Sequence, residues 1–171
     1  AKDGLEALNV IKDNEIDMIK SVLIANRGEI AIRIARTARR MGIKTYVVRT
    51  AKEPEAVYLS AADAVINFPE TDGNIPEFLD IDRLVGLAQE YKIDSLHPGY
   101  GYLSENAELA ERCRDNGIVF IGPSPEVIRL MGDKVAAKGI AAQSGVPMLG
   151  ASQGAVHTLD EARKIAKRLG Y

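Results

Sequence analysis

The chain has 171 residues, 46% of them hydrophobic and 27% charged, which predicts one folded globular domain rather than a disordered chain. Its 22 Lys and Arg residues against 24 Asp and Glu residues give a formal net charge of -2, which argues against a general binder of nucleic acid or of anionic membranes. The single cysteine, Cys113, excludes an internal disulfide and a multi-cysteine zinc site.

No apolar run in the sequence approaches the roughly 20 residues that span a bilayer. The N-terminus also lacks the basic region, the apolar stretch and the small-residue cleavage site of a secretory signal. We therefore expect a cytoplasmic protein. A mitochondrial matrix protein whose transit peptide has been removed would look the same.

Short aliphatic runs alternate with amphipathic stretches along the chain. The runs predict strands, the last of them the clearest, at 21–25, 43–48, 64–66, 94–97 and 118–121. The amphipathic stretches predict helices from Gly28 to Gly42, from Ile81 to about Ala88, from Ser104 as N-cap to Gly117, over 125–131 and 134–144, and from Thr158 to Leu169. The prolines and glycine of 69–78 predict a loop.

Five predicted strands that alternate with helices indicate an α/β fold. We expect a parallel sheet of about five strands, covered by helices on both faces and joined by right-handed crossovers. Ligands of such sheets bind beyond the carboxyl ends of the strands. The candidate binding loops are therefore those after the first, fourth and fifth strands, at 26–28, 97–101 and 122–124.

The first helix is predicted to have two different faces. Its apolar face, expected to be buried, contains Ile30, Ile34, Ala38 and Met41. Arg33, Arg36 and Arg40 lie opposite, as a solvated strip or as a contact with a partner subunit, since arginine is enriched at interfaces. In a later helix, Cys113 lies on the apolar side and is expected to be a buried, inert thiol.

The turn after the first strand, Ala25-Asn-Arg-Gly-Glu29, lacks the G-x-G-x-x-G pattern of dinucleotide-binding turns. The sequence also lacks a phosphate-binding G-x-x-x-x-G-K-[ST] loop. Two interpretations remain for this turn. Gly28 aims helix N-terminal amides at an anion, or the turn is structural and Arg27 forms hydrogen bonds with neighbouring loops.

Two further segments carry candidate functional residues. In 97–106, glycines let the backbone approach a ligand closely and tyrosines offer flat faces with a hydroxyl, while His97 is either a structural hydrogen-bonding group or a catalyst. Lys134 lies in the first turn of a helix, where the helix dipole disfavours a cation by about 0.3–1 kcal/mol. A bound phosphate would remove that penalty; the alternative is a solvated lysine.

Four segments occur in the order Val22–Ala31, His97–Asn106, Phe120–Pro123 and Met131–Lys134. Together they resemble the N-terminal domain of the biotin carboxylase component of biotin-dependent carboxylases, which act on acetyl-CoA, propionyl-CoA, other acyl-CoA esters, pyruvate or urea. The resemblance implies a Rossmann-like, three-layer pre-ATP-grasp domain over 18–150. It also implies that 151–171 is a helix leading into an ATP-grasp domain outside this chain. An extension of unassigned role is expected at 1–17.

The resemblance implies a reaction in which ATP, Mg²⁺ and bicarbonate form carboxyphosphate and the carboxyl group passes to a nitrogen of carrier-bound biotin. Most catalytic groups of the family belong to the ATP-grasp part, so we expect no catalytic residue and no metal ligand here, and no activity from the isolated chain. The implied partners are that ATP-grasp part, the biotin carboxyl carrier protein, the carboxyltransferase and a second copy in a homodimer.

By position, Lys134 matches the family lysine that contacts ATP, and Tyr100 and Gly101 match the loop at the biotin end of the site. Arg36 matches an arginine of the homodimer interface, but Arg40 stands where the family often has an acid. Two alternatives differ in class. The chain is a non-catalytic dimerisation or docking module, or it belongs to another ATP-grasp ligase such as a carbamoyl-phosphate or purine-pathway enzyme.

Overall fold

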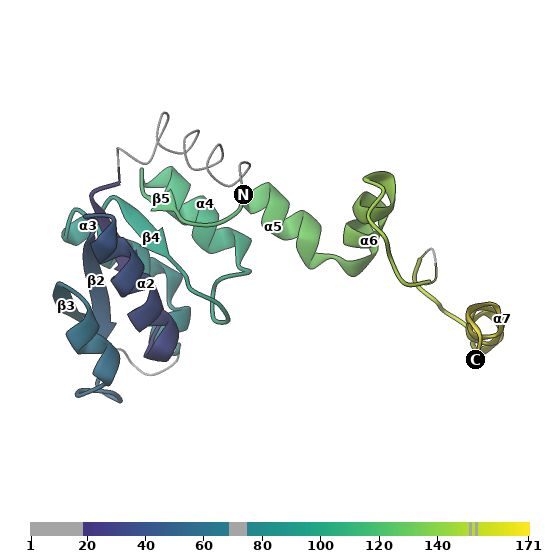
Figure 1. Ribbon diagram of the computed structural model, residues 1–171, viewed down its shortest axis with the longest axis horizontal. Helices are drawn as coiled ribbons and strands as arrows, with labels where there is room; N and C mark the ends of the chain where they lie inside the picture. Colours follow the sequence, from purple (N-terminus) through teal and green to yellow (C-terminus); the bar gives the residue numbers. More distant parts are fainter. Residues whose placement is uncertain (1–18, 69–74, 151, 153) are drawn as a thin grey trace. The chain divides into compact units, whose positions relative to one another are not determined.

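The computed structural model describes residues 19–68, 75–150, 152 and 154–171. It divides into two compact units, one ending at Pro125 and the other running from Glu126 to Tyr171, and the α-helices and most strands are labelled in Figure 1. The predicted 1–17 extension and most of the predicted 69–78 loop lie outside the described residues. The end of that loop is a 3₁₀ turn, η3 (Glu77–Leu79), rather than irregular chain.

The first unit contains the predicted parallel sheet. Its strands are β1 (Ser21–Ile24), β2 (Lys44–Arg49), β3 (Ala64–Asn67), β4 (Ser95–His97) and β5 (Val119–Phe120). They pair in parallel in the order β3-β2-β1-β4-β5, which confirms the α/β fold. The prediction that 118–121 is the clearest strand is wrong in extent: only two of its residues form the strand, at the edge of the sheet.

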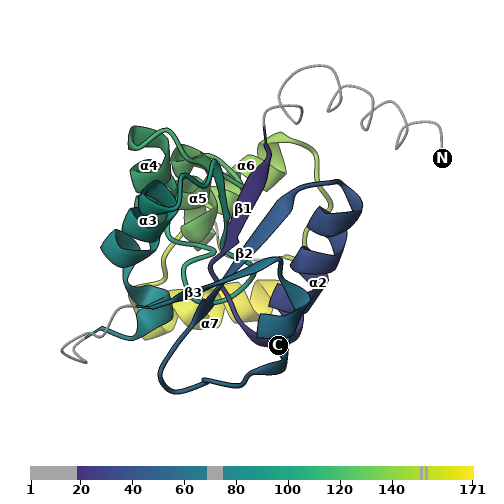
Figure 2. The ribbon, with the colours of Figure 1, turned by 90° about the vertical axis from the view of Figure 1, so that its left-hand side faces the viewer.

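Helices cover both faces of this sheet (Figure 2). The chain runs from β1 outward to β2 and β3, with α2 (Gly28–Arg40) and the 3₁₀ turn η2 (Val57–Ala61) as connections. It then crosses back over β1 to β4 and β5, through α3 (Ile81–Glu90) and α4 (Ala107–Asp115). Because parallel crossovers are right-handed, reversing the direction of winding puts α3 and α4 on the face opposite α2.

Alternate residues of the central strands enter two separate cores. Val22, Ile24 and Val47 pack on the side of α2 and η2, whereas Leu23 and Val48 pack on the side of α3 and α4. The strands are buried on both faces, which is why they read as continuous apolar runs in the sequence.

The buried face of α2 differs from the predicted one. The helix packs on the sheet through Ala31, Ala35 and Ala38, of which only Ala38 was predicted. Small side chains let the helix axis approach the strands closely, so the larger Ile30 and Ile34 are displaced to a flank of the helix. There they are only half-buried, and Met41, just beyond the helix, is 54% exposed.

The start of α4 also differs from the prediction. Asn106, not Ser104, is the N-cap, because its side chain accepts a hydrogen bond from the Leu109 N–H at 3.0 Å. Two successive turns precede the helix, in which the Ser104 N–H donates to the Gly101 carbonyl and the Asn106 N–H to the Leu103 carbonyl. These turns occupy Ser104 and delay the helix by two residues.

The second unit consists of helices, of which α5 (Pro125–Gly132) begins at the boundary between the units and is followed by α6 (Lys134–Gln143) and α7 (Leu159–Leu169). All three agree with the predicted segments. Thr158 caps α7 by accepting the Glu161 N–H at 3.2 Å, as the capping-box spacing predicts. In the part of the chain that the structure describes, no helix has the length and apolar character needed to cross a bilayer.

Candidate functional site

The strand order creates a switch point between β1 and β4. The chain leaves β1 toward β2 on one side and leaves β4 toward β5 on the other side. The two strands pair directly, with Ile24 opposite His97. The Ala25 N–H extends the ladder by donating to the His97 carbonyl at 2.9 Å. The turns that begin at Asn26 and at His97 therefore leave the same edge of the sheet side by side. In open parallel sheets, ligands bind at such a point.

Asn26 joins the two turns. Its side chain is buried, and its Nδ2 donates to the Pro98 carbonyl and to the Tyr100 carbonyl, both at 2.8 Å. Its Oδ1 accepts the Arg27 N–H at 2.9 Å. At Gly99, φ is +69° and an added Cβ would lie 2.6 Å from Asn26 Nδ2, so only glycine fits against this side chain.

Charged side chains from the start of α2 contact the same loop. The Tyr100 hydroxyl donates to the Glu29 carboxylate. Arg27 Nε donates to the Tyr102 hydroxyl oxygen at 2.6 Å, and the same guanidinium forms an ion pair with Glu53. This is the structural role predicted for Arg27. The anion-binding interpretation of Gly28 is not supported, because the Glu29 carboxylate already lies at this helix end and accepts the adjacent amide.

The Glu29 contact sets the ionisation of Tyr100. The hydrogen bond to the carboxylate raises the pKa of the Tyr100 phenol, and the same bond lowers the pKa of Glu29. Tyr100 is therefore a neutral donor whose hydroxyl is occupied, rather than a base. Its ring is exposed, so what it offers to a ligand is a flat apolar face.

Tyr102 has an unusual backbone conformation in this loop. Its φ is +40°, in the left-handed region that a bulky residue rarely adopts. The contact with Arg27 and a ring contact with Phe78, with centroids 5.4 Å apart, hold it there. Strained residues of this kind persist where the surrounding structure fixes them, and they concentrate at functional sites.

His97 and Cys113 have structural roles. His97 Nδ1 accepts the Gly99 N–H at 3.0 Å, which stabilises the turn, and burial lowers the pKa of its imidazole. The neutral ring therefore carries its proton on Nε2. Cys113 is fully buried, and burial raises the pKa of its thiol to about 12, which confirms the predicted inert thiol.

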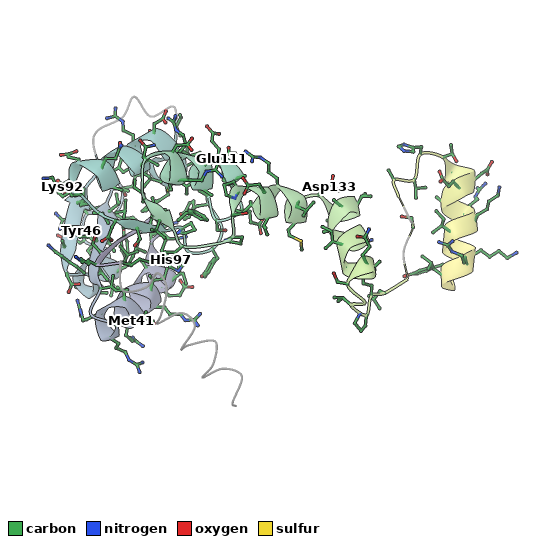
Figure 3. The ribbon with its side chains drawn as sticks, turned by 90° about the horizontal axis from the view of Figure 1, so that it is seen from above. Met41, Tyr46, Lys92, His97, Glu111 and Asp133 are labelled. Atoms are coloured by element: carbon green, nitrogen blue, oxygen red, sulfur yellow. The ribbon has the colours of Figure 1, made fainter. Side chains whose placement is uncertain are left out.

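An apolar groove of about 590 Å³ lies beside the switch point. It exists because α2 covers β1 and β2 but leaves part of the same sheet face, toward β5, uncovered. Two of its lining residues, His97 and Met41, are labelled in Figure 3. Further lining residues are Val22, Ile30, Arg33, Ile34, Thr37, Val119 and Ile121.

Lys134 lies in the second unit, as the first and exposed residue of α6. Together with Lys138, one turn further along, it lines a cavity of about 760 Å³. Asp133, labelled where α6 begins in Figure 3, accepts the Val135 and Ala136 N–H groups at 2.8 and 2.9 Å. The negative charge of this N-cap offsets the dipole penalty predicted for Lys134. Because the cap also occupies two backbone N–H groups at the start of the helix, the Lys134 ammonium is the group here that can contact an anion.

The structure places the predicted site residues in three locations. Tyr100 and Gly101 lie at the switch point, Arg36 is exposed on α2, and Lys134 lies in the second unit. The contacts of Asn26 and Glu29 with the Tyr100 loop were not predicted from the sequence. The available signal was that two candidate loops at one sheet edge both carry polar side chains. Among the described residues, no three His, Cys, Asp or Glu side chains are grouped to hold a metal ion.

Comparison with known proteins identifies the family. Residues 18–128 match the family described as the N-terminal domain of biotin carboxylase. The biotin carboxylase of Nostoc sp. is 44% identical over 150 residues, which are 88% of this chain and 33% of that protein. The chain thus spans about a third of the length of that relative.

Two solved structures show the same similarity. The biotin carboxylase complex with β,γ-ATP from Campylobacter jejuni has a TM-score of 0.80 and 42% identity, over 90% of this chain and 34% of its own. The biotin carboxylase domain dimer of the Hydrogenobacter thermophilus 2-oxoglutarate carboxylase, in complex with MgADP, ADP and bicarbonate, has a TM-score of 0.79 and 41% identity over the same shares. The family match over 18–128, the sequence identity and the structural similarity together show that this chain belongs to the biotin carboxylase N-terminal domain family.

Proposed function

We propose that this chain forms one wall of an active site that carboxylates biotin with ATP and bicarbonate, within a longer protein whose ATP-grasp part supplies the other walls. The observation that carries the proposal is the switch point, where Asn26 and Glu29 fix the Tyr100–Gly101 loop at the edge used for ligands by parallel sheets. The relatives support it, since one is a complex with a nucleotide and another a complex with MgADP and bicarbonate.

In the proposed reaction, Mg-bound ATP activates bicarbonate and the carboxyl group passes to a nitrogen of biotin. This chain's part is to bind and to orient. Lys134 places an ammonium against a nucleotide phosphate, where a charge-assisted contact is strong. Tyr100 presents its ring to the biotin end of the site. Its phenol stays protonated, because the hydrogen bond that it donates to the Glu29 carboxylate raises its pKa. Gly101 lets the backbone approach closely, since its φ of +64° is free of strain only for glycine.

The remaining groups are proposed to come from outside the chain. The predicted boundaries, with the domain at 18–150 and a connecting helix at 151–171, leave the metal-binding carboxylates and the groups around bicarbonate to the ATP-grasp part. A biotin carboxyl carrier protein and a carboxyltransferase would then deliver and use the carboxyl group. The isolated chain is proposed to be inactive.

A homodimer through the exposed face of α2 is proposed as well, with Arg36 in the contact. The dimer of the Hydrogenobacter thermophilus domain supports this assembly. Arg33, Arg36 and Arg40 are all exposed on α2, so this surface is more basic than the family pattern with an acid at the last position. Acidic groups of the partner copy are therefore expected opposite it.

The test of the nucleotide proposal is Lys134→Ala in the full-length carboxylase that contains this chain. Loss of a charge-assisted contact should raise the KM for ATP by about 10- to 150-fold. The matched control is Lys164→Ala, which removes an exposed lysine from α7 and should leave the KM unchanged. An unaltered KM for ATP in the Lys134 variant would remove this residue from the site.

A further inference from the structure

We propose that Asn26 is a positioning residue for biotin, acting through the peptide that joins Tyr100 to Gly101. The proposal rests on the proposed function, in which that peptide lies at the biotin end of the site. Asn26 itself is 3% exposed, and its contacts, given above, are all with backbone. Its effect on a ligand is therefore indirect.

The hydrogen-bond pattern around Asn26 accepts no other side chain. Two carbonyl oxygens, of Pro98 and Tyr100, need donors, and the Arg27 N–H needs an acceptor. A primary amide of this length supplies two N–H groups on one side and an oxygen on the other. Aspartate has the same shape but would direct a negative oxygen at two carbonyl oxygens. Alanine would leave all three backbone groups, which are buried or part-buried, without this side-chain partner.

The contact with the Tyr100 carbonyl determines the direction of the Gly101 amide. The carbonyl of Tyr100 and the N–H of Gly101 belong to one planar trans peptide, so they point in opposite directions. When Asn26 holds the carbonyl at 2.8 Å, the Gly101 N–H is turned away from Asn26 and toward the exposed side of the loop. Residue 100 has a glycine on each side, with φ of +69° at Gly99 and +64° at Gly101. Glycines restrict the backbone little, so the hydrogen bonds from Asn26 are what fix the conformation of this segment.

Residue 100 is thus held at both ends from the start of α2. Asn26 holds its carbonyl and Glu29 accepts its hydroxyl. The peptide and the ring face that the proposed function assigns to biotin are fixed before any ligand binds. Preorganisation of this kind lowers the entropic cost of binding.

The experiment uses the full-length carboxylase, with free biotin, ATP and bicarbonate as varied substrates. Asn26→Ala and Asn26→Asp should each raise the KM for biotin by about three- to tenfold, as expected when a neutral hydrogen bond that orders the loop is lost. The KM for ATP should stay unchanged, and kcat at saturating biotin should change little, because the lost contact acts on binding. Asn26→Ser, with one donor, should lie between these variants and the unaltered enzyme.

The matched control is Asn106→Ala. It removes an equal amide that caps α4 through Leu109 and makes no contact with Tyr100, so it should lower the thermal stability without separating the two KM values. The Asn26→Ser variant also decides the question if the alanine variant does not fold.

Two results would overturn the inference. One is an unchanged KM for biotin in Asn26→Asp and Asn26→Ser while the unaltered enzyme turns over biotin. The other is a parallel rise of both KM values, which would make Asn26 a residue of general stability. Absence of biotin-dependent turnover in the unaltered enzyme would instead overturn the proposed function, and the inference with it.

Discussion

His97 ends β4 with a half-buried, neutral imidazole whose Nδ1 accepts the Gly99 N–H. Burial lowers its pKa below the ordinary value of 6.5, so the folded chain takes up this proton at lower pH than the unfolded chain does. The contribution of the neutral His97 to the free energy of unfolding is therefore complete above about pH 6.5. It is lost as the pH falls toward the pKa of His97 in the folded chain. Protonation would also remove the acceptor on which the turn depends.

This effect is measurable by urea unfolding of the chain between pH 8 and pH 5. His97→Gln should flatten the decrease in the free energy of unfolding below about pH 6.5, because the titrating group is gone. His157→Gln, which replaces the other histidine at an exposed position, serves as control and should keep the decrease. Equal slopes for the His97 variant and the unaltered chain would contradict the assignment.

At the level of single residues, the sequence predicted what local chemistry determines. The burial of Cys113 was predicted from its position on an apolar helix face and is confirmed, whereas the role of Tyr100 and Gly101, inferred from their motif, stays a prediction. The role of Asn26 was not predictable in the same way, because its partners lie 72 and 74 residues away. Their proximity depends on β1 and β4 being neighbours, and the strand order of a parallel sheet is not encoded in any single strand.

Among the elements, α2 shows how a helix face is selected. Periodicity favoured the large Ile30 and Ile34, whereas the sheet is contacted by Ala31, Ala35 and Ala38. Hydropathy ranks isoleucine above alanine, but a close helix–sheet contact needs small side chains, and that distance is a property of the packed structure. The larger residues instead line the groove beside the sheet.

The close packing of α2 on the sheet through alanines predicts that a larger side chain at one of these positions lowers the stability of the chain. Ala35 is fully buried, and Ala35→Leu should lower the free energy of unfolding by about 1–3 kcal/mol, because a close-packed contact cannot accept the added volume. Thr37→Leu, at an exposed position of the same helix, should change it by less than about 0.5 kcal/mol. Chemical denaturation of both variants checks this; equal stabilities would show that α2 does not pack through its alanines.

Element boundaries were predicted less well than element types. The 118–121 run is apolar enough for a longer strand, but β5 has a neighbour on one side only and pairs through Val119 and Phe120. Ser104 is as good an N-cap as Asn106 by residue type, yet the turns after Gly101 take it out of position. In both cases the deciding contact comes from backbone outside the element itself.

For the whole molecule, alternating strands and helices were sufficient to predict the α/β class, and four ordered motifs were sufficient for the family. The division of the chain into two compact units at Pro125 was not predicted from the sequence. The first unit holds the Tyr100–Gly101 loop, and the second holds Lys134. Candidate binding residues are thus present in each unit, and the proposed function assigns the chemistry to an ATP-grasp part outside this chain.

The proposed function is tested by measuring phosphate release from ATP in the presence of bicarbonate, with and without free biotin. The measurement compares the 171-residue chain with the full-length protein that contains it, at equal molar concentration. We expect biotin to stimulate phosphate release from the full-length protein, and we expect no release from the 171-residue chain. Biotin-stimulated release by the short chain, or its absence from the full-length protein, would contradict the proposed function.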